Sequence, residues 1–340
     1  MKKILFVTRK RKDAIWIVDQ NLQEQLKSLN PEIDFLELPA KGTTKFAVLR
    51  NYLRASAILL TKSFGYKTVF FSWENIFVVI LKFFYPFKDI VMMVHHMDGY
   101  WWNKFTTNII LKSCTRFVAI SNSTKNQLTS WNISANNILV NYNGVDKKYY
   151  PQKIENFHDS PYILYVWDEY PRKNMKWILG AFAKLVKKYP ALKLIKVWRV
   201  QSSKDQADTD KLVSDLKLKN NIIFKRGFIE TDELRLYFSN AECLLLVSFL
   251  EWFGMTVPEA MACGCPVVVS DRAPMTELVQ NKQVRVDPDN IDDIFHWIDQ
   301  IISDKIFQNQ LSAQALELAK NFDRAQAWKQ LNDFLIKTWN

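Results

Sequence analysis

The chain has 340 residues, 48% of them hydrophobic and 24% charged, which excludes a disordered protein and allows two globular domains of ordinary size. Charged residues and a proline interrupt the most apolar stretch, residues 68–96, so no segment reaches the roughly 20 apolar residues of a membrane-spanning helix. The four cysteines include one close pair, Cys263 and Cys265, with no histidine nearby, so a metal site is not expected there.

The net charge of +11 belongs to the first part of the chain. Residues 1–150 contain 21 lysines and arginines against 10 acidic residues, whereas residues 151–340 contain 25 of each. This distribution predicts that the first part contacts something anionic: lipid headgroups, a phosphate-bearing acceptor or nucleic acid. The apolar run at residues 4–7 is too short for a signal peptide, so a soluble, cytoplasmic protein is expected.

Short apolar strands alternate with helical patterns along both halves of the chain. In the first half, strands are expected at residues 2–8, 68–71, 90–94 and 116–120, and helices at 76–84, 104–113, from Ser123, and after the first strand through Trp16, Leu22 and Leu26. In the second half, strands are expected at 162–166, 192–197, 222–225, 243–247 and 266–269, and helices at 175–188, 231–239 and 258–263. Such alternation predicts parallel sheets covered by helices.

The pattern therefore favours an α/β protein with two Rossmann-like, doubly wound domains. The expected boundaries are residues 1–150 for a basic N-terminal domain and 151–322 for a C-terminal domain, with a helix in residues 323–340 packing back on the N-terminal domain. Because ligands bind beyond the carboxyl ends of strands in such sheets, two facing domains would enclose a cleft.

Two acids lie close together in the segment SFLEWFGMTVPEAMACGCPVVVSD, residues 248–271. Glu251 is expected on the loop after strand 243–247, and Glu259 in the first turn of a helix that begins at Pro258. Gly254, between them, would let backbone amides approach a ligand closely. Amides beside two carboxylates suit a ligand with phosphate and hydroxyl groups, a nucleotide sugar. The alternative is that Glu259 only stabilises the helix start and Glu251 is solvated.

The same segment resembles the acid-seven-acid signature of the family 4 glycosyltransferases, which are retaining enzymes of the GT-B fold. The matching residues are Glu251, Phe253, Gly254, Pro258, Glu259, Ala260, Met261, Ala262, Gly264, Pro266 and Val267. Further counterparts follow in the family's order: His95, the turn at 143–146, residues 172–174, Gly227 and residues 275–277. The resemblance is close in the second half and loose in the first.

The resemblance implies a role for each matching position. The counterpart of Glu259 binds the ribose hydroxyls of the donor, and that of Glu251 meets hydroxyls of the transferred sugar. The donor site is further expected to include Phe253, Gly254, Met255, Thr256 and Gly227. Neither a metal nor another cofactor is expected, because a fixed lysine does the work of a metal ion on the diphosphate.

Lys173 and Arg172 precede the helix at 175–188, where a fixed positive charge could neutralise the leaving diphosphate. The resemblance gives this role to Lys173, usually beside an arginine at the end of the preceding strand. Trp167 stands there instead, so either Arg172 supplies the second charge or Lys173 acts with backbone amides. The alternative is that both are solvated at a helix start.

Trp167 and Trp198 are both expected at strand ends where related enzymes have glycine. A ring at either position could stack on the nucleotide base or narrow its pocket, and core filling is the equal alternative. Asp208 and Asp210 imitate a metal-binding acid-x-acid pattern in a polar run that is expected to precede a helix, so helix capping is the preferred interpretation.

His95 and His96 follow strand 90–94, and alternation along a strand predicts that only one of them faces the ligand. His95 is preferred as the catalytic one and His96 is placed on the acceptor side; the order could be reversed, and a structural histidine is the alternative. The acceptor side is also expected to include Arg9, Lys10 and Arg11. With the aromatic residues at 83–87 and 99–102, these basic residues could contact an anionic membrane, or form a solubilising surface.

These features predict a retaining transferase that moves a hexose from a nucleoside diphosphate sugar, UDP rather than GDP, to a hydroxyl of a glycan or lipid-linked acceptor. A phosphorylase or epimerase using the same cleft is one alternative. The other is a non-catalytic binder of nucleotide sugars or nucleic acid, which Trp167 and the basic first half favour slightly. Nucleic acid is not expected as the partner.

Overall fold

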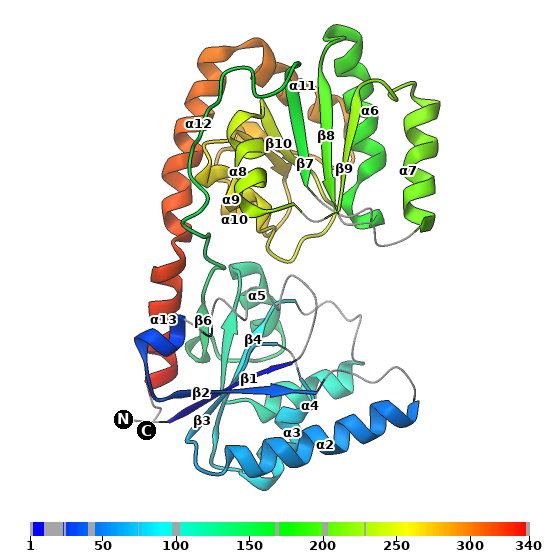
Figure 1. The fold of residues 1–340 in the computed structure, drawn as a ribbon. Helices are drawn as coiled ribbons and strands as arrows, with labels where there is room; N and C mark the ends of the chain where they lie inside the picture. The colour runs from blue at the N-terminus through cyan, green and yellow to red at the C-terminus, as the bar shows by residue number, and fades with distance from the viewer. Residues whose placement is uncertain are drawn as a thin grey trace. The chain divides into compact units, whose positions relative to one another are not determined.

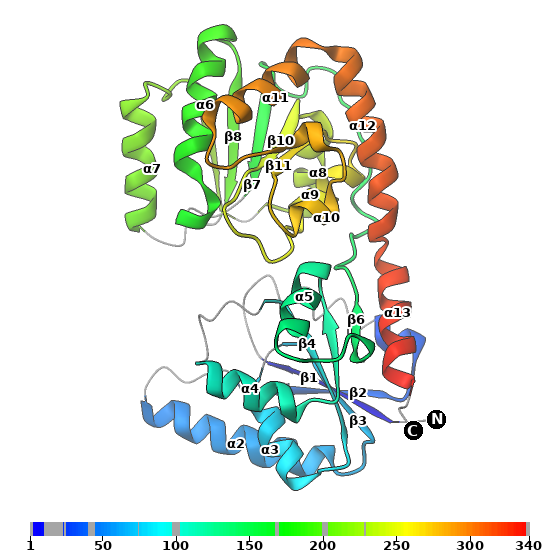
Figure 2. The ribbon, with the colours of Figure 1, turned by 180° about the vertical axis from the view of Figure 1, so that it is seen from behind.

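A computed structural model describes residues 3–9, 23, 25–39, 45–73, 75–96, 103–166, 170–198, 203–227 and 229–337, without the side chains of residues 9, 45, 198, 203–205 and 226. The chain forms two compact units (Figures 1 and 2). The first consists of Met1–Gly144 with Ala325–Asn340, and the second is the continuous segment Val145–Arg324. Each unit is built around one parallel sheet, which confirms the expected pair of Rossmann-like α/β domains.

The first unit contains a six-stranded parallel sheet. Across the sheet the strands are β2 (Ile33–Leu38), β1 (Ile4–Arg9), β3 (Thr68–Phe71), β4 (Asp89–Val94), β5 (Arg116–Ala119) and β6 (Ile138–Val140). Strands β3 and β5 are buried along their whole length because helices cover the sheet. The direction in which the chain crosses the sheet reverses between β1 and β3, which makes their carboxyl ends a topological switch point.

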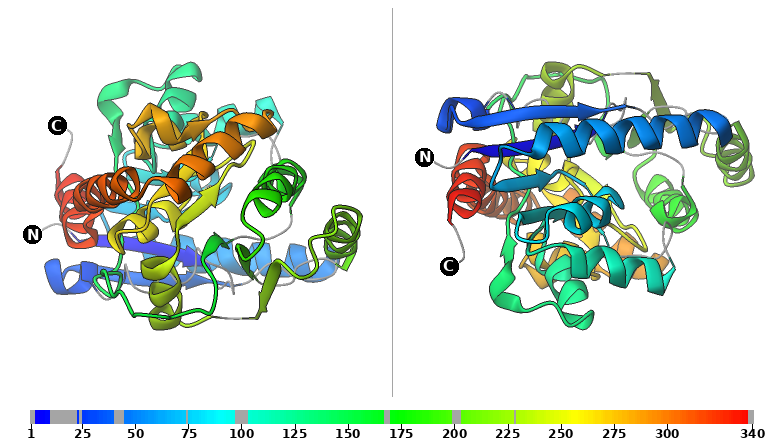
Figure 3. Two further views of the ribbon diagram at one scale, coloured as in Figure 1. Left: turned by 90° about the horizontal axis from the view of Figure 1, so that it is seen from above. Right: turned by 90° about the horizontal axis from the view of Figure 1, so that it is seen from below.

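Three helices cover one face of this sheet: α2 (Lys45–Ser63), α3 (Phe77–Phe84) and α4 (Lys104–Ser113). The chain moves in one direction from β2 to β5, so right-handed crossovers place all three on the same side. Helix α3 packs between α2 and α4 (Figures 1 and 3). Helix α5 (Asn122–Ser130) follows and contacts β5 and β6.

Strand β2 and helix α2 are additions to the expected alternation. Only the two end residues of β2, Ile33 and Leu38, are fully buried, so this edge strand lacks the continuous apolar run of the inner strands. The helix expected through Trp16 and Leu22 falls largely outside the described residues, and a helical segment is present at 25–29. Within the described ranges, no helix is both long enough and apolar enough to cross a membrane.

The second unit contains the other six-stranded parallel sheet. Its strands lie in the order β12 (Arg285–Val286), β11 (Val267–Ser270), β10 (Cys243–Leu246), β7 (Tyr162–Val166), β8 (Lys193–Trp198) and β9 (Ile222–Arg226). Counted along the chain from β9, this is the Rossmann order 3-2-1-4-5-6, which places the switch point between β7 and β10. Loops at the carboxyl ends of these two strands are therefore the expected place for a ligand.

The helices of the second unit are α6 (Met175–Lys188), α7 (Ser203–Asp215), α8 (Thr231–Asn240), α9 (Thr256–Ala262), α10 (Met275–Leu278), α11 (Ile291–Ser303) and α12 (Lys305–Ala319). Helix α7 corrects one expectation, because the polar run with Asp208 and Asp210 lies inside the helix and does not precede it. Residues two apart on a helix point to different sides, so the spacing does not bring the two carboxylates together.

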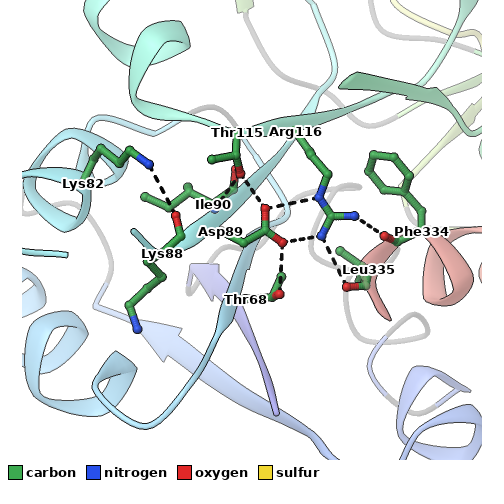
Figure 4. Close-up of polar contacts among 9 residues, drawn as sticks. All are labelled: Thr68, Lys82, Lys88, Asp89, Ile90, Thr115, Arg116, Phe334 and Leu335. Carbon is green, nitrogen blue, oxygen red and sulfur yellow. Dashed lines mark hydrogen bonds and ion pairs between the residues drawn. The ribbon is translucent and has the colours of Figure 1, made fainter. Parts of the chain in front are cut away.

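Helix α13 (Arg324–Ile336) belongs to the first unit from Ala325 onward. Its C-terminal end is held by Arg116, the buried first residue of β5 (Figure 4). The guanidinium donates hydrogen bonds to the carbonyl oxygens of Phe334 and Leu335, and its carbon lies 4.7 Å from the centre of the Phe334 ring. Asp89, at the start of β4, pairs with the same guanidinium. A buried cation thus ties α13 to the amino ends of β4 and β5.

Replacing Arg116 with methionine is expected to lower the free energy of unfolding by about 3 kcal/mol, because Asp89 and the two carbonyl oxygens lose their donor. Arg272→Met is the matched control, since Arg272 and Asp289 form an ion pair with 43% and 53% of their side chains exposed. Its expected effect is below about 1 kcal/mol. Chemical denaturation of both variants measures the difference, and equal losses would contradict the role given to Arg116.

Candidate functional site

The candidate site lies on two loops at the switch point of the second unit. The loop after β7 contains a short 3-10 helix, Pro171–Lys173, and leads into α6; the loop after β10 leads into α9. The amide of Phe249 donates to the carbonyl oxygen of Arg172 at 2.8 Å. The side-chain amide of Asn174 donates to the carbonyl oxygens of Val247 at 2.9 Å and Pro288 at 2.7 Å. The bonds to Arg172 and Val247 hold the two loops against each other, and the bond to Pro288 ties them to the segment after β12.

Lys173 and Glu251 meet in a buried ion pair. The Nζ atom of Lys173 lies 2.5 Å from Oε1 of Glu251, and the side chains are only 1% and 4% exposed. A buried pair persists only where its desolvation is offset by close, well-oriented contacts. The structure therefore brings together two predicted residues that are far apart in the sequence, in a contact that their spacing did not predict.

Arg172 adds a second positive charge to the same carboxylate. Its Nη1 atom lies 3.5 Å from Oε2 of Glu251 and donates to the carbonyl oxygen of Leu250 at 3.0 Å. The guanidinium also lies over the rings of Trp252, at 5.2 Å, and Tyr170, at 5.7 Å. The side chain keeps 29% of its surface exposed, so this cation is fixed in direction and accessible to an anion.

Gly254 shapes the backbone that leads into α9. Its φ of +83° favours glycine, and a Cβ atom there would lie 2.6 Å from Cε of Met275 and 3.1 Å from Leu246. Helix α9 begins at Thr256, so the predicted start at Pro258 is two residues late. Proline is tolerated in a first turn because those amides have no intrahelical acceptor. In this turn the amide of Val257 donates to the carbonyl oxygen of Gly254 at 2.9 Å, and the buried Phe253 and the N-cap residue Met255 lie in the loop that precedes the helix.

Glu259, in the first turn of α9, is half-buried beside polar and charged groups. Burial raises its pKa to about 8, while the charge of Arg324 and a hydrogen bond from Tyr149 act in the opposite direction. The nearby charge of Asp146 raises the pKa further, although Asp146 itself pairs with Arg324 at 2.7 Å. Tyr149, Asp146 and Arg324 were not predicted as site residues; the turn at 143–146 was the sequence feature that pointed toward them.

Each element around the site also buries a side-chain oxygen that has no hydrogen-bond partner among the described residues. These atoms are Oδ1 of Asn174, Oγ of Ser248 and Oγ1 of Thr256. Buried polar atoms in native proteins are almost always paired, so these three are candidates for direct contact with a ligand. Thr256 was predicted for the donor site, whereas Asn174 and Ser248 were not.

A further charged residue that was not predicted lies in the sheet beside the site. Lys196 is a buried residue of β8, and its Nζ atom lies 6.0 Å from the centre of the Tyr165 ring. The hydroxyl of Tyr165 donates to the carbonyl oxygen of Lys173 at 3.2 Å. A lysine within the apolar run 194–197 is the sequence feature that could have identified it.

The predicted histidines belong to the first unit. His95 and His96 follow β4 and are both half-buried. The Nε2 atom of His95 lies 2.9 Å from the carbonyl oxygen of Ser72, which follows β3. A carbonyl oxygen only accepts, so Nε2 carries the proton of the ring. His95 is thus held at the carboxyl ends of β3 and β4.

Three further predicted residues lie at the carboxyl ends of other strands. Gly227 follows β9, which β8 separates from β7, and it has a φ of +108° with no atom within 4 Å of an added Cβ. Trp198 ends β8 and Arg9 ends β1, but their side chains are outside the described residues. Residues Trp167, Lys10 and Arg11 are also outside the described residues.

Comparison with protein families identifies the second unit. The profile of the family described as glycosyl transferases group 1 matches residues 146–318, half of the chain. The chain is 29% identical over 220 residues to the O-antigen chain mannosyltransferase RfbU of Salmonella typhimurium, an alignment that covers 62% of this chain and 55% of that protein. It is 28% identical over 163 residues to the O-antigen chain mannosyltransferase B of Escherichia coli, covering 47% and 42%. The chain thus spans about half the length of these curated relatives.

Solved structures share the whole fold. The Anabaena protein HepE, crystallised with UDP and glucose, superposes with a TM-score of 0.81 at 16% identity, covering 98% of this chain and 99% of that one. The apo form of the lipopolysaccharide outer core galactosyltransferase WaaB gives 0.75 at 18% identity, covering 98% of both chains. These likenesses confirm the GT-B fold, and the profile match confirms the resemblance carried by residues 251–267. The chain belongs to the group 1 glycosyl transferases.

Proposed function

We propose that the protein is a retaining glycosyltransferase that moves a hexose-type sugar from a nucleoside diphosphate sugar to a hydroxyl of a glycan or lipid-linked acceptor, in the cytoplasm. The observation that carries the proposal is the buried pair of Lys173 and Glu251 at the switch point between β7 and β10. Burial keeps both groups in fixed positions, and a preorganised charge is worth more in a site that excludes water. The names of the relatives make mannose the first sugar to test.

In the proposed reaction, the ammonium of Lys173 neutralises the charge that develops on the diphosphate as the bond to the anomeric carbon breaks. Arg172 and backbone amides around Phe253, Gly254 and Met255 hold the same diphosphate. Glu251 accepts hydrogen bonds from hydroxyls of the sugar and Glu259 from those of the ribose. The acceptor oxygen attacks the anomeric carbon from the face that the diphosphate leaves, and its proton passes to a departing phosphate oxygen. The products are a glycoside and a nucleoside diphosphate.

A thermal-shift screen with UDP, GDP and their hexose derivatives tests the donor, because a ligand that binds only the folded protein raises its apparent stability. One nucleoside diphosphate sugar is expected to raise the melting temperature well above the effect of inorganic phosphate. UDP compounds are the preferred ligands, and a response to GDP-sugars alone would move the preference to GDP. Product analysis then gives the anomeric configuration: an inverted product would contradict retention, and a stable protein unaffected by every donor would contradict the proposal.

A further inference from the structure

Helix α2 exposes an apolar stripe on the side that faces away from its own sheet. Phe46, Leu49 and Leu53 are 75%, 57% and 59% exposed and recur at intervals of three and four residues, which places them on one side of the helix. Ala55 and Leu59 are buried on the opposite side. The helix therefore has one apolar side packed in the core of the first unit and a second apolar side directed outward.

More phenylalanines are exposed on the helices next to it. Phe83, Phe84 and Phe87, at the end of α3 and in the turn after it, are 80%, 58% and 100% exposed. Phe64, which follows α2 and is 78% exposed, has its ring 6.4 Å from that of Tyr85, so the ends of α2 and α3 lie together. Phe105, in the first turn of α4, is 74% exposed. We define the phenylalanine face as Phe46, Leu49, Leu53, Phe64, Phe83, Phe84, Phe87 and Phe105.

The three helices that carry this face contain only one sign of charge. Helices α2, α3 and α4 have seven lysines and arginines and no aspartate or glutamate. Arg50 and Arg54 are exposed beside the stripe on α2, and Lys104 and Lys112 are exposed on α4. The three helices lie side by side on the same face of the sheet (Figures 1 and 3). Exposed rings and positive charges therefore occur together on three neighbouring helices.

A surface with this many exposed apolar side chains marks an interaction site. A second copy of the chain is a poor partner, because two such faces would bring like charges together. Nucleic acid could contact the arginines through its phosphates and stack its bases on the rings, but it has no apolar group that would bury the aliphatic side chains of Leu49 and Leu53. An anionic lipid surface satisfies both parts, because apolar side chains enter the boundary between headgroups and acyl chains while basic residues meet the phosphates.

We propose that the phenylalanine face docks on an anionic lipid bilayer, with the axes of α2, α3 and α4 along the membrane surface. The phenylalanines and leucines enter the interface, and Arg50, Arg54, Lys104 and Lys112 contact lipid phosphates. The inference depends only on the surface of the first unit, so its failure and the failure of the proposed transfer reaction are separate results.

Sedimentation with vesicles tests the apolar part of the proposal. The full chain is expected to bind vesicles of phosphatidylcholine mixed with phosphatidylglycerol at least tenfold more strongly than pure phosphatidylcholine. The triple variant Phe46→Ser, Phe83→Ser, Phe87→Ser is expected to bind the mixed vesicles at least tenfold less. Its matched control is Ile154→Ser, Ile306→Ser, which removes side chains that are 41% and 73% exposed in the second unit and should leave binding unchanged. Equal binding by both variants and the parent would overturn the proposal.

A second pair of variants tests the charge. Arg50→Glu, Arg54→Glu should abolish the preference for mixed vesicles, while Lys187→Glu, Lys211→Glu, an equal change at exposed positions of the second unit, should retain it. If both double variants lost vesicle binding, the net charge of the protein would explain the binding, and the proposal would be overturned. Two further results would also overturn the proposal. In the first, the parent binds oligonucleotides but not vesicles, and Arg50→Glu, Arg54→Glu abolishes the oligonucleotide binding. In the second, the parent is a dimer in solution and the triple serine variant dissociates it.

Discussion

The double variant Lys173→Met, Glu251→Gln is expected to fold like the parent and to lose sugar transfer by roughly a hundredfold to a thousandfold, the usual effect of removing a preorganised charge from a transition state. Nucleoside diphosphate release from the donor identified by the thermal-shift screen measures the loss. Because both charges are removed together, neither residue is left as an isolated buried ion. The variant therefore separates catalysis from stability.

The single variants are expected to behave differently. Lys173→Ala leaves the carboxylate of Glu251 buried, with only Arg172 near it, and removing one partner of a buried pair costs about 3–5 kcal/mol of folding free energy. Melting temperature and activity should then fall together. Lys184→Met, Asp292→Asn is the matched control, because this ion pair on α6 and α11 is exposed, and neither property should change. Full turnover in the Lys173→Met, Glu251→Gln variant would refute the assignment of these two residues.

The affinity for the sugar nucleotide is expected to rise with pH, by up to tenfold per pH unit below about pH 8, and then to level off. The reason is the raised pKa of Glu259, about 8: near neutral pH the side chain is mostly protonated, whereas ribose hydroxyls are best accepted by the carboxylate. Donor binding then requires loss of one proton. A sugar nucleotide is the appropriate ligand, because its diphosphate has no proton that titrates in this range.

Glu259→Gln supplies the control for this pH dependence. Its affinity should be low and independent of pH, and a variant that keeps the parent's slope would contradict the role of Glu259. Stability gives a second measurement of the same pKa. The pKa of Glu259 is higher in the folded protein, about 8, than its value of 4.5 in the unfolded chain. Its contribution to the free energy of unfolding is therefore fully present below pH 4.5 and is lost as the pH rises through about 8. Glu259→Gln should therefore weaken the decline in the free energy of unfolding over that range.

Much of the fold could be predicted from the sequence where the chain is buried on both sides. The continuous apolar runs of β3 and β7 are typical of inner strands in a sheet that is covered on both faces. Their predicted bounds agree with the structure. The edge strand β2 has exposed and half-buried residues between its two buried ends, so it carries no comparable pattern. Helix α7 is largely polar, and the sequence predicted a polar run that ends where a helix begins. Edge strands and surface helices depend on tertiary contacts, which the local pattern of apolar and polar residues does not encode.

The site shows the same division. The carboxylates at Glu251 and Glu259, and Gly254 between them, could be placed because they lie in one short segment. The contact of Lys173 with Glu251 could not, since it depends on β7 and β10 being neighbours in the sheet. Asp146, Tyr149 and Arg324, which interact with Glu259, come from two distant parts of the sequence that meet where a β-bridge joins Val145 to Asp323.

The attachment of α13 through Arg116 also has a consequence for the order of folding. The second unit is one continuous segment, Val145–Arg324, and can form as soon as it leaves the ribosome. The first unit is synthesised earlier, but it needs Ala325–Asn340 to pair Arg116 with the end of α13. The first sheet is thus synthesised before the second unit but is completed after it, because a basic, phenylalanine-rich domain gains α13 only once the other unit has been made.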